Sequence, residues 1–94
     1  FGVKHPEYAI SLSNLGTLYI KMGHYADAEP FLKESLEIMK TFGVNRIDYA
    51  YSLNNLGHLY IEMGNYDAAE PLLKESLKIV KINLIICMYL HQEE

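Results

Sequence analysis

The sequence predicts an all-α fold, a solenoid of antiparallel helix hairpins with two repeats and a C-terminal tail. Residues 1–41 and 42–82 are identical at 26 of 41 aligned positions, and self-similarity at a fixed period is the signature of repeat architectures. Within each repeat, apolar and small residues recur at spacings of three and four, as on one face of a helix. We therefore expect repeat 1 at residues 1–41, repeat 2 at 42–82, and a non-repeat tail at 83–94 that extends the last helix.

The first helix of each repeat is expected to begin near Pro6 or its counterpart and to end before a glycine. Pro6 suits a first helical position, because its missing N–H would be unpaired there anyway. Gly23 and Gly64 follow the periodic stripe and can take the left-handed conformation that ends a helix. The stripe residues are Tyr8, Leu12, Leu15, Gly16 and Tyr19, and then Tyr49, Leu53, Leu56, Gly57 and Tyr60.

The second helix of each repeat follows after a short turn, so consecutive helices should pack antiparallel. Pro30 and Pro71 lie slightly past the position where proline costs nothing, and we expect a small distortion or a lost hydrogen bond there. The stripe residues are Ala28, Leu32, Ser35, Leu36 and Met39, and then Ala69, Leu73, Ser76, Leu77 and Val80.

Gly16 and Gly57 lie in the middle of the first helices, where glycine costs about 1 kcal/mol relative to alanine. Close packing is the expected compensation. Ala28 and Ala69 on the partner helices are small enough to let the two backbones approach.

Composition and charge exclude several classes of partner. Eight basic against twelve acidic residues give a net charge of −4, which argues against a nucleic-acid partner. The longest apolar run, from Leu84 to Leu90, is far short of the roughly 20 residues that span a bilayer, so no membrane partner is expected. Cys87 is the single cysteine and cannot form an internal disulfide, so we expect a buried or interface thiol and a cytoplasmic location.

No catalytic residue, metal site or cofactor is expected. The four histidines are scattered, and none stands four residues from another, the spacing that would place two ligands on one helix face. A glycine-rich phosphate loop is also missing from the sequence. The chain is therefore predicted not to be an enzyme.

The stripe residues of both repeats resemble the signature of the tetratricopeptide repeat family. Gly23 and Tyr25 in repeat 1, and Gly64 and Tyr66 in repeat 2, extend the match. The longer period, together with His5-Pro6 and the segment 28–33, resembles the extended subclass found in kinesin light chains. The resemblance covers residues 1–82. Beyond Ile82 the pattern fails, because Asn83-Leu84 stands where the period requires Phe-Gly.

The resemblance implies a scaffold that binds a protein or an extended peptide on the concave face of a superhelix, which the first helix of each repeat lines. Asn14 and Asn55 are the preferred binding residues, because a carboxamide can both donate to and accept from a peptide backbone. The alternative is that they are solvated or bond neighbouring helix backbone. A clamp for a C-terminal carboxylate would also need cations nearby, and only Lys21 qualifies. The full set of candidate peptide-binding residues is Ser13, Asn14, Thr17, Lys21, Tyr51, Asn54, Asn55, His58 and Glu62.

Two other functions remain open from the sequence. The chain could be a structural or self-assembly segment of a longer repeat array, or the regulatory arm of an enzyme whose catalysis is encoded elsewhere. The tail allows two interpretations as well. Its apolar side could cover the exposed end of the stack, or the run from Leu84 to Leu90 could pair with another chain and form a homo-oligomer.

Overall fold

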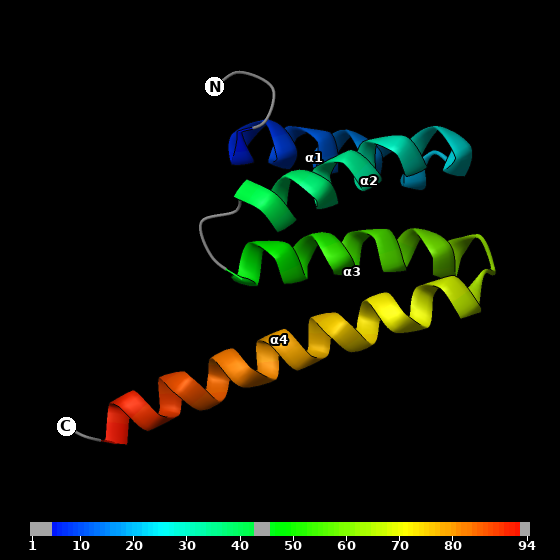
Figure 1. Cartoon of the computed structure of the whole chain (residues 1–94). Coiled ribbons are helices and arrows are strands. Elements are labelled where there is room, and N and C mark those ends of the chain that lie inside the picture. The colour runs from blue at the N-terminus through cyan, green and yellow to red at the C-terminus, as the bar shows by residue number, and fades with distance from the viewer. Residues whose placement is uncertain (1–4, 43–45, 93–94) are drawn as a thin grey trace.

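The computed structural model describes residues 5–42 and 46–92 and contains four helices (Figure 1). They are α1 (Pro6–Lys21), α2 (Tyr25–Phe42), α3 (Arg46–Glu62) and α4 (Tyr66–Gln92). α1 and α2 form one antiparallel hairpin, α3 and α4 form the second, and α2 packs against α3 to join them. The all-α prediction is confirmed. Residues 1–4 of predicted repeat 1, residues 43–45 of predicted repeat 2 and residues 93–94 of the predicted tail lie outside the described residues.

Two glycines end the first helices, as the sequence predicts. Gly23 and Gly64 have φ angles of 80° and 76°, in the region that glycine reaches without steric cost. The N–H of Gly23 donates to the carbonyl of Ile20 at 2.9 Å, and the N–H of His24 donates to the carbonyl of Tyr19 at 2.8 Å. These two bonds form the motif that satisfies the last carbonyls of a helix, and the bonds around Gly64 have the same lengths.

Side chains cap the N-termini of two helices. His5 precedes α1, and its Nδ1 accepts from the N–H of Glu7 at 3.1 Å. Asn65 precedes α4, and its Oδ1 accepts from the N–H of Ala68 at 3.3 Å. Each bond satisfies an N–H that has no partner inside the helix. Pro30 and Pro71 lie inside α2 and α4, and neither ends its helix.

The main core joins the two repeats. Its buried residues come from α1, α2 and α3, so this core lies between the first hairpin and α3. They are Ile20 from α1, Ala28 and Leu32 from α2, and Leu56 and Leu59 from α3. Smaller buried clusters hold each hairpin together, one around Leu12 and Ile38 and one around Leu53 and Ile79. Burial of this kind is the main favourable contribution to folding.

Buried serines tie each second helix to its first. Ser35 Oγ donates to the carbonyl oxygen of Ala9 at 2.8 Å, and Ser76 Oγ donates to that of Ala50 at 3.0 Å. The two bonds occupy equivalent positions in the two repeats. They satisfy hydroxyls that would otherwise be costly to bury, and the small side chains leave room for the helices to approach.

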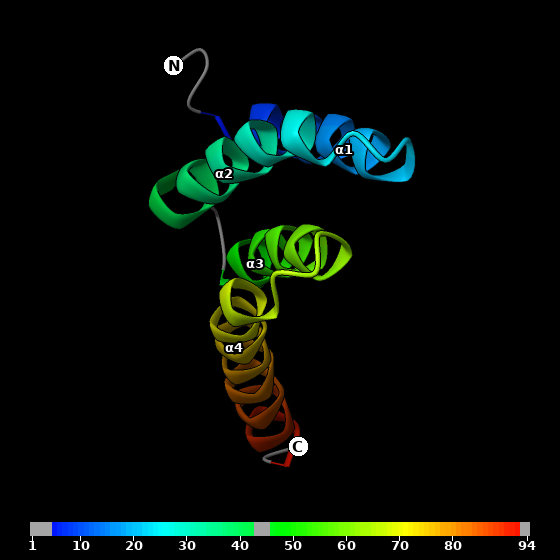
Figure 2. The same cartoon turned by 90° about the vertical axis from the view of Figure 1, so that its right-hand side faces the viewer.

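The tail extends α4 but does not cover the stack. α4 runs to Gln92, and Figure 2 shows its C-terminal part leading away from the other helices. The expectation that its apolar side covers the end of the stack is wrong, because every large apolar side chain between residues 84 and 90 is more than half exposed. The Cys87 thiol is also exposed, so it is not buried within this chain.

The expected close approach at the mid-helix glycines is present in both hairpins. A Cβ atom added to Gly16 would lie 2.7 Å from Leu32 Cδ2, and one added to Gly57 would lie 2.8 Å from Leu73 Cδ2. Their surroundings differ. Leu32 is enclosed between the repeats at 1% exposure, whereas Leu73 is only partly buried and lines an open groove.

Substitution of the two glycines by alanine should therefore have unequal effects. Gly16→Ala should lower the free energy of unfolding by about 1–2 kcal/mol, because over-packing against an immobile leucine outweighs alanine's better helix propensity. Gly57→Ala should change it by no more than about 0.5 kcal/mol, since Leu73 can shift into the groove. Urea unfolding followed by circular dichroism measures both. Equal losses, or a larger loss for Gly57→Ala, would contradict this account.

Candidate functional site

The first helices of the two repeats, α1 and α3, lie on the inner side of the stack. The backbone of α1 lies close to that of α3, whereas the backbones of α2 and α4 stay apart in the part of the chain that the structure describes. Figure 2 shows α2 and α4 spread apart, with α3 between them. The stack is thus closed on the side of the first helices and open on the side of the second helices.

Each first helix presents an exposed stripe at helical spacing, and the two stripes occupy equivalent positions. We call them together the inner stripe. Its residues on α1 are Ile10, Asn14, Thr17 and Lys21. Its residues on α3 are Tyr51, Asn55, His58 and Glu62, with Asn54 beside them. All of these residues are exposed except Asn55, which is partly buried. Eight of the nine predicted binding residues are therefore in this stripe.

Ser13 is the exception, and it does not belong to the exposed site. It is buried at 7% exposure, and its Oγ lies 2.6 Å from Ser35 Oγ. Because the Ser35 hydroxyl already donates to the Ala9 carbonyl, the Ser13 hydroxyl donates to Ser35. Its counterpart in repeat 2, Asn54, is exposed. The same register position thus faces the hairpin core in one repeat and solvent in the other.

Charge is distributed unevenly along the inner stripe. At its end, Lys21 in repeat 1 stands where repeat 2 has Glu62. His58 Nε2 lies 3.8 Å from Glu62 Oε2, and the two groups form an ion pair only if the imidazole is protonated. A carboxylate-binding clamp needs several cations around the asparagines, and this arrangement does not favour one.

A polar contact between the repeats fixes how the two halves of the stripe are placed. Tyr60 Oη donates to Glu29 Oε2 at 2.7 Å, and Lys33 Nζ lies 3.2 Å from the same oxygen. The bond from Tyr60, followed by that from Lys33, lowers the pKa of Glu29 below its ordinary value. Burial, and then the bond to Glu29, raises the pKa of Tyr60. Because Tyr60 is on α3 and Glu29 on α2, the contact holds α3 in register with repeat 1.

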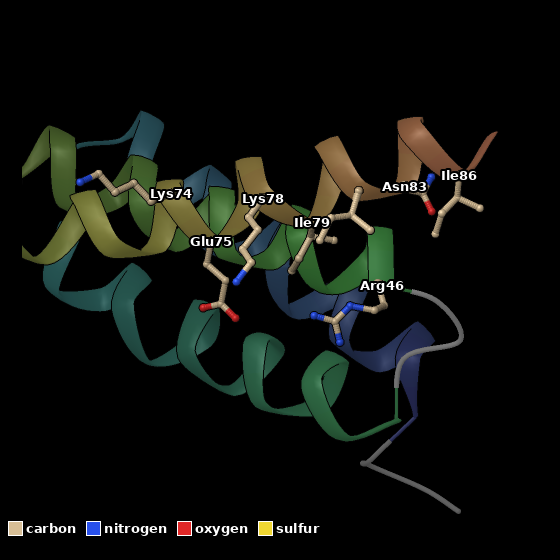
Figure 3. Close-up of a pocket in the computed structure, with 8 residues that line it drawn as sticks. Arg46, Lys74, Glu75, Lys78, Ile79, Asn83 and Ile86 are labelled. Atoms are coloured by element: carbon tan, nitrogen blue, oxygen red, sulfur yellow. The ribbon is translucent and has the colours of Figure 1, made fainter. Parts of the chain in front are cut away.

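Sequence reasoning missed a hollow of about 480 Å³ (Figure 3). It lies between α4 and the start of α3, and is lined by Arg46, Lys74, Glu75, Lys78, Ile79, Ile82, Asn83 and Ile86. Figure 3 shows the Glu75 and Lys78 side chains projecting from α4 on the side where Arg46 lies. The helical spacing of Ile79, Ile82 and Ile86 was the available signal for it. None of the predicted binding residues lines this hollow.

Comparison with known proteins identifies the repeat. The family model described as tetratricopeptide repeat matches residues 1–41 and 32–82. The chain belongs to the tetratricopeptide repeat family. Among curated proteins, none matches it. Tetratricopeptide repeats generally mediate protein binding and are typically non-catalytic.

Two further findings concern the described residues, 5–42 and 46–92. They contain no group of three or more His, Cys, Asp or Glu side chains placed to hold a metal ion. Nor does any helix among them combine the length and the apolar character that crossing a bilayer requires.

The hydrogen bond from Tyr60 to Glu29 between the repeats makes the fold less stable at acid pH. A carboxyl whose pKa is lowered by folding stabilises the fold fully above its unfolded pKa, and the contribution is lost as the pH falls through the lower, folded value. Glu29 should therefore lose its contribution below about pH 4.5. Tyr60→Phe should lower the free energy of unfolding by about 1 kcal/mol at pH 7. It should also make the loss of stability between pH 7 and pH 3 smaller. Urea unfolding at pH 7 and pH 3 tests both effects. A variant as acid-sensitive as the natural chain would refute the assignment.

Proposed function

We propose that the chain is a protein-binding scaffold that holds an extended peptide segment along the inner stripe. The observation that carries this proposal is the equivalence of Asn14 and Asn55. They are the same residue at the same position of two adjoining helices, and both have a side chain that solvent reaches. Protein binding is also the general role of the family.

The chemistry of the stripe favours recognition of peptide backbone. A carboxamide pairs with both the N–H and the C=O of an extended chain, so Asn14 and Asn55 could grip a segment at two points. Tyr51 offers a ring that is 67% exposed, of the kind enriched in binding hot spots. Thr17, His58 and Asn54 add polar contacts along the path.

The charges at the end of the stripe limit the choice of ligand. Lys21 and Glu62 have opposite sign and occupy equivalent positions, so the stripe has no uniform field that would select an acidic or a basic end. We infer that the ligand is an internal, extended segment of a protein and not a free C-terminus.

Finer assignments belong to the same proposal. The 41-residue period, the His5-Pro6 pair and the segment 28–33 favour the kinesin light chain type of repeat, with units at residues 1–41 and 42–82 and a tail at 83–94. A cytoplasmic location is supported by Cys87, whose free and exposed thiol suits a reducing compartment.

Loss of the two carboxamides should abolish most of the binding. We expect the natural chain to select peptides from a random library. Asn14→Ala/Asn55→Ala should then weaken the affinity for the selected peptides by about 30-fold, since two hydrogen bonds contribute about 2 kcal/mol. Isothermal titration measures the change, and circular dichroism checks that the helices are retained.

The matched control is Glu34→Ala/Lys81→Ala, which removes two exposed side chains from the second helices. It should bind as the natural chain does. Equal binding by the asparagine variant, or an equal loss in the control, would exclude the inner stripe as the peptide site.

A second candidate function is pairing of two chains through residues 84–90. It is supported by the exposure of Leu84, Ile85, Ile86, Met88, Tyr89 and Leu90, each above one half, because a continuous apolar surface of this kind marks an interaction site.

A charge in the middle of this run should prevent the pairing. Met88→Glu should lower the average mass that light scattering measures at a fixed chain concentration, because burying an unpaired carboxylate is costly. Leu84→Glu should act in the same direction. A natural chain whose mass stays that of one molecule at every concentration would exclude this role.

A further inference from the structure

The contact between the two repeats leaves an identical, uncovered face at the C-terminal end of the stack. α3 packs over one face of the first hairpin, and the equivalent face of the second hairpin has no cover. Ile20 is 8% exposed and its counterpart Ile61 is 39% exposed, while Leu36 is partly buried and its counterpart Leu77 is 68% exposed. Because the residues of each pair are identical, the difference comes from the missing cover.

This uncovered face is a groove, which we call the tail groove. Its apolar character is pronounced, and its volume is about 430 Å³. The residues that line it are Ile61, Tyr66, Ala69, Glu70, Leu73, Lys74 and Leu77. Six of these seven are the 41-residue counterparts of buried or partly buried residues in repeat 1, and the seventh, Lys74, is the counterpart of Lys33.

The opposite end of the stack presents the matching surface. Leu56 and Leu59 of α3 pack into the core between the repeats, at 4% and 0% exposure. Their counterparts on α1, Leu15 and Leu18, are 37% and 51% exposed. The outer face of α1, which we call the head face, therefore has the same leucines that α3 inserts against repeat 1, and within the described part of the chain they are exposed.

We propose that a second copy of this chain docks its head face into the tail groove of the first, and so repeats the α2–α3 contact between molecules. The occupant follows from the internal contact, because the principal residues on both of its sides have identical counterparts at the two ends of the stack. On the receiving side these are Ile61, Ala69, Leu73 and Leu77. On the inserting side they are Leu15, Leu18 and Tyr19.

The polar link of the internal contact has its partners in place as well. Within the chain, Tyr60 donates to Glu29. At the free ends, Glu70 is already paired with Lys74 at 3.1 Å, as Glu29 is with Lys33. Tyr19 is partly buried against Phe31, with ring centroids 5.7 Å apart. Tyr19 of the incoming copy would thus donate to Glu70 as Tyr60 does to Glu29.

The geometry of this contact determines the kind of assembly. The head face and the tail groove are different surfaces, so the contact is heterologous and leaves one free end of each kind, which permits further growth. The groove residues lie between 61 and 77, and the part of α4 that has no counterpart in α2 begins after residue 83. This surface is separate from the inner stripe of the proposed function.

Two obstructing charges, one at each end, test the proposal directly. All chains in this experiment have Met88→Glu, which prevents pairing through residues 84–90. In that background we expect a mass that rises with concentration in sedimentation velocity. Adding Leu18→Glu or Leu77→Glu should each give a single chain. An equimolar mixture of the two should form a complex of two chains and nothing larger, because only one intact head face then meets one intact tail groove.

Controls distinguish this contact from other associations. Met22→Glu is the matched control, since Met22 and its counterpart Met63 are both more than 40% exposed and the internal contact covers neither. The Met22→Glu chain should assemble like its parent. Tyr19→Phe should raise the dissociation constant of the mixed complex about fivefold. Circular dichroism verifies the helices of every variant.

Three results would overturn the proposal. They are a single-chain mass for the Met88→Glu parent at every concentration, continued association of the Leu18→Glu or Leu77→Glu chain alone, and a mixture that stays dissociated. The last two results would assign any association to a symmetric or unrelated surface.

Discussion

The packing of α3 against α2 is the contact on which the rest of the structure depends. A single helix hairpin buries only one side of its helices, and Leu32 reaches 1% exposure because Leu56 and Leu59 of α3 close over it. The hydrogen bond from Tyr60 to Glu29 is directional, so it fixes the register of α3 on α2, which the apolar contact alone does not. Together they set the position of α3 relative to α1, and therefore the position of Asn55 relative to Asn14. A change in that packing would therefore alter the geometry of the inner stripe even though no residue of the stripe is substituted.

The internal geometry of each hairpin rests on small residues, and it is repeated. Gly16 and Gly57 admit a leucine from the partner helix where a Cβ atom would collide. Ser35 and Ser76 bond to the carbonyls of Ala9 and Ala50 at the same register. Two hairpins built alike can stack through one recurring contact, because each presents the same shape to the next.

Much of this could be predicted from the sequence, because its causes are local. Helix type, the glycine ends at Gly23 and Gly64, and the close approach at Gly16 follow from spacing and from the stereochemistry of glycine. What the sequence did not predict depends on neighbours. Ser13 and Asn54 share a register, but Ser13 is held by Ser35 inside the hairpin and Asn54 is exposed. Periodicity identifies which face of a helix is buried. It does not decide whether a residue at the edge of that face is buried or exposed. For the tail, hydrophobicity indicated a need for cover but not that residues 84–90 would extend away from the stack.

The two surfaces of the chain differ in how their residues change between the repeats, and this difference supports the two separate proposals. Along the inner stripe the counterparts are mostly different residues, such as Thr17 and His58, or Lys21 and Glu62. Between the repeats they are identical, as with Ile20 and Ile61, or Leu18 and Leu59. A surface that reads a partner benefits from a different side chain at each step, whereas a surface that stacks must present the same shape each time. Asn14 and Asn55 are the identical pair within the varied stripe. That is what a repeated grip on peptide backbone requires, since the backbone is the part of a ligand that does not vary from one residue to the next.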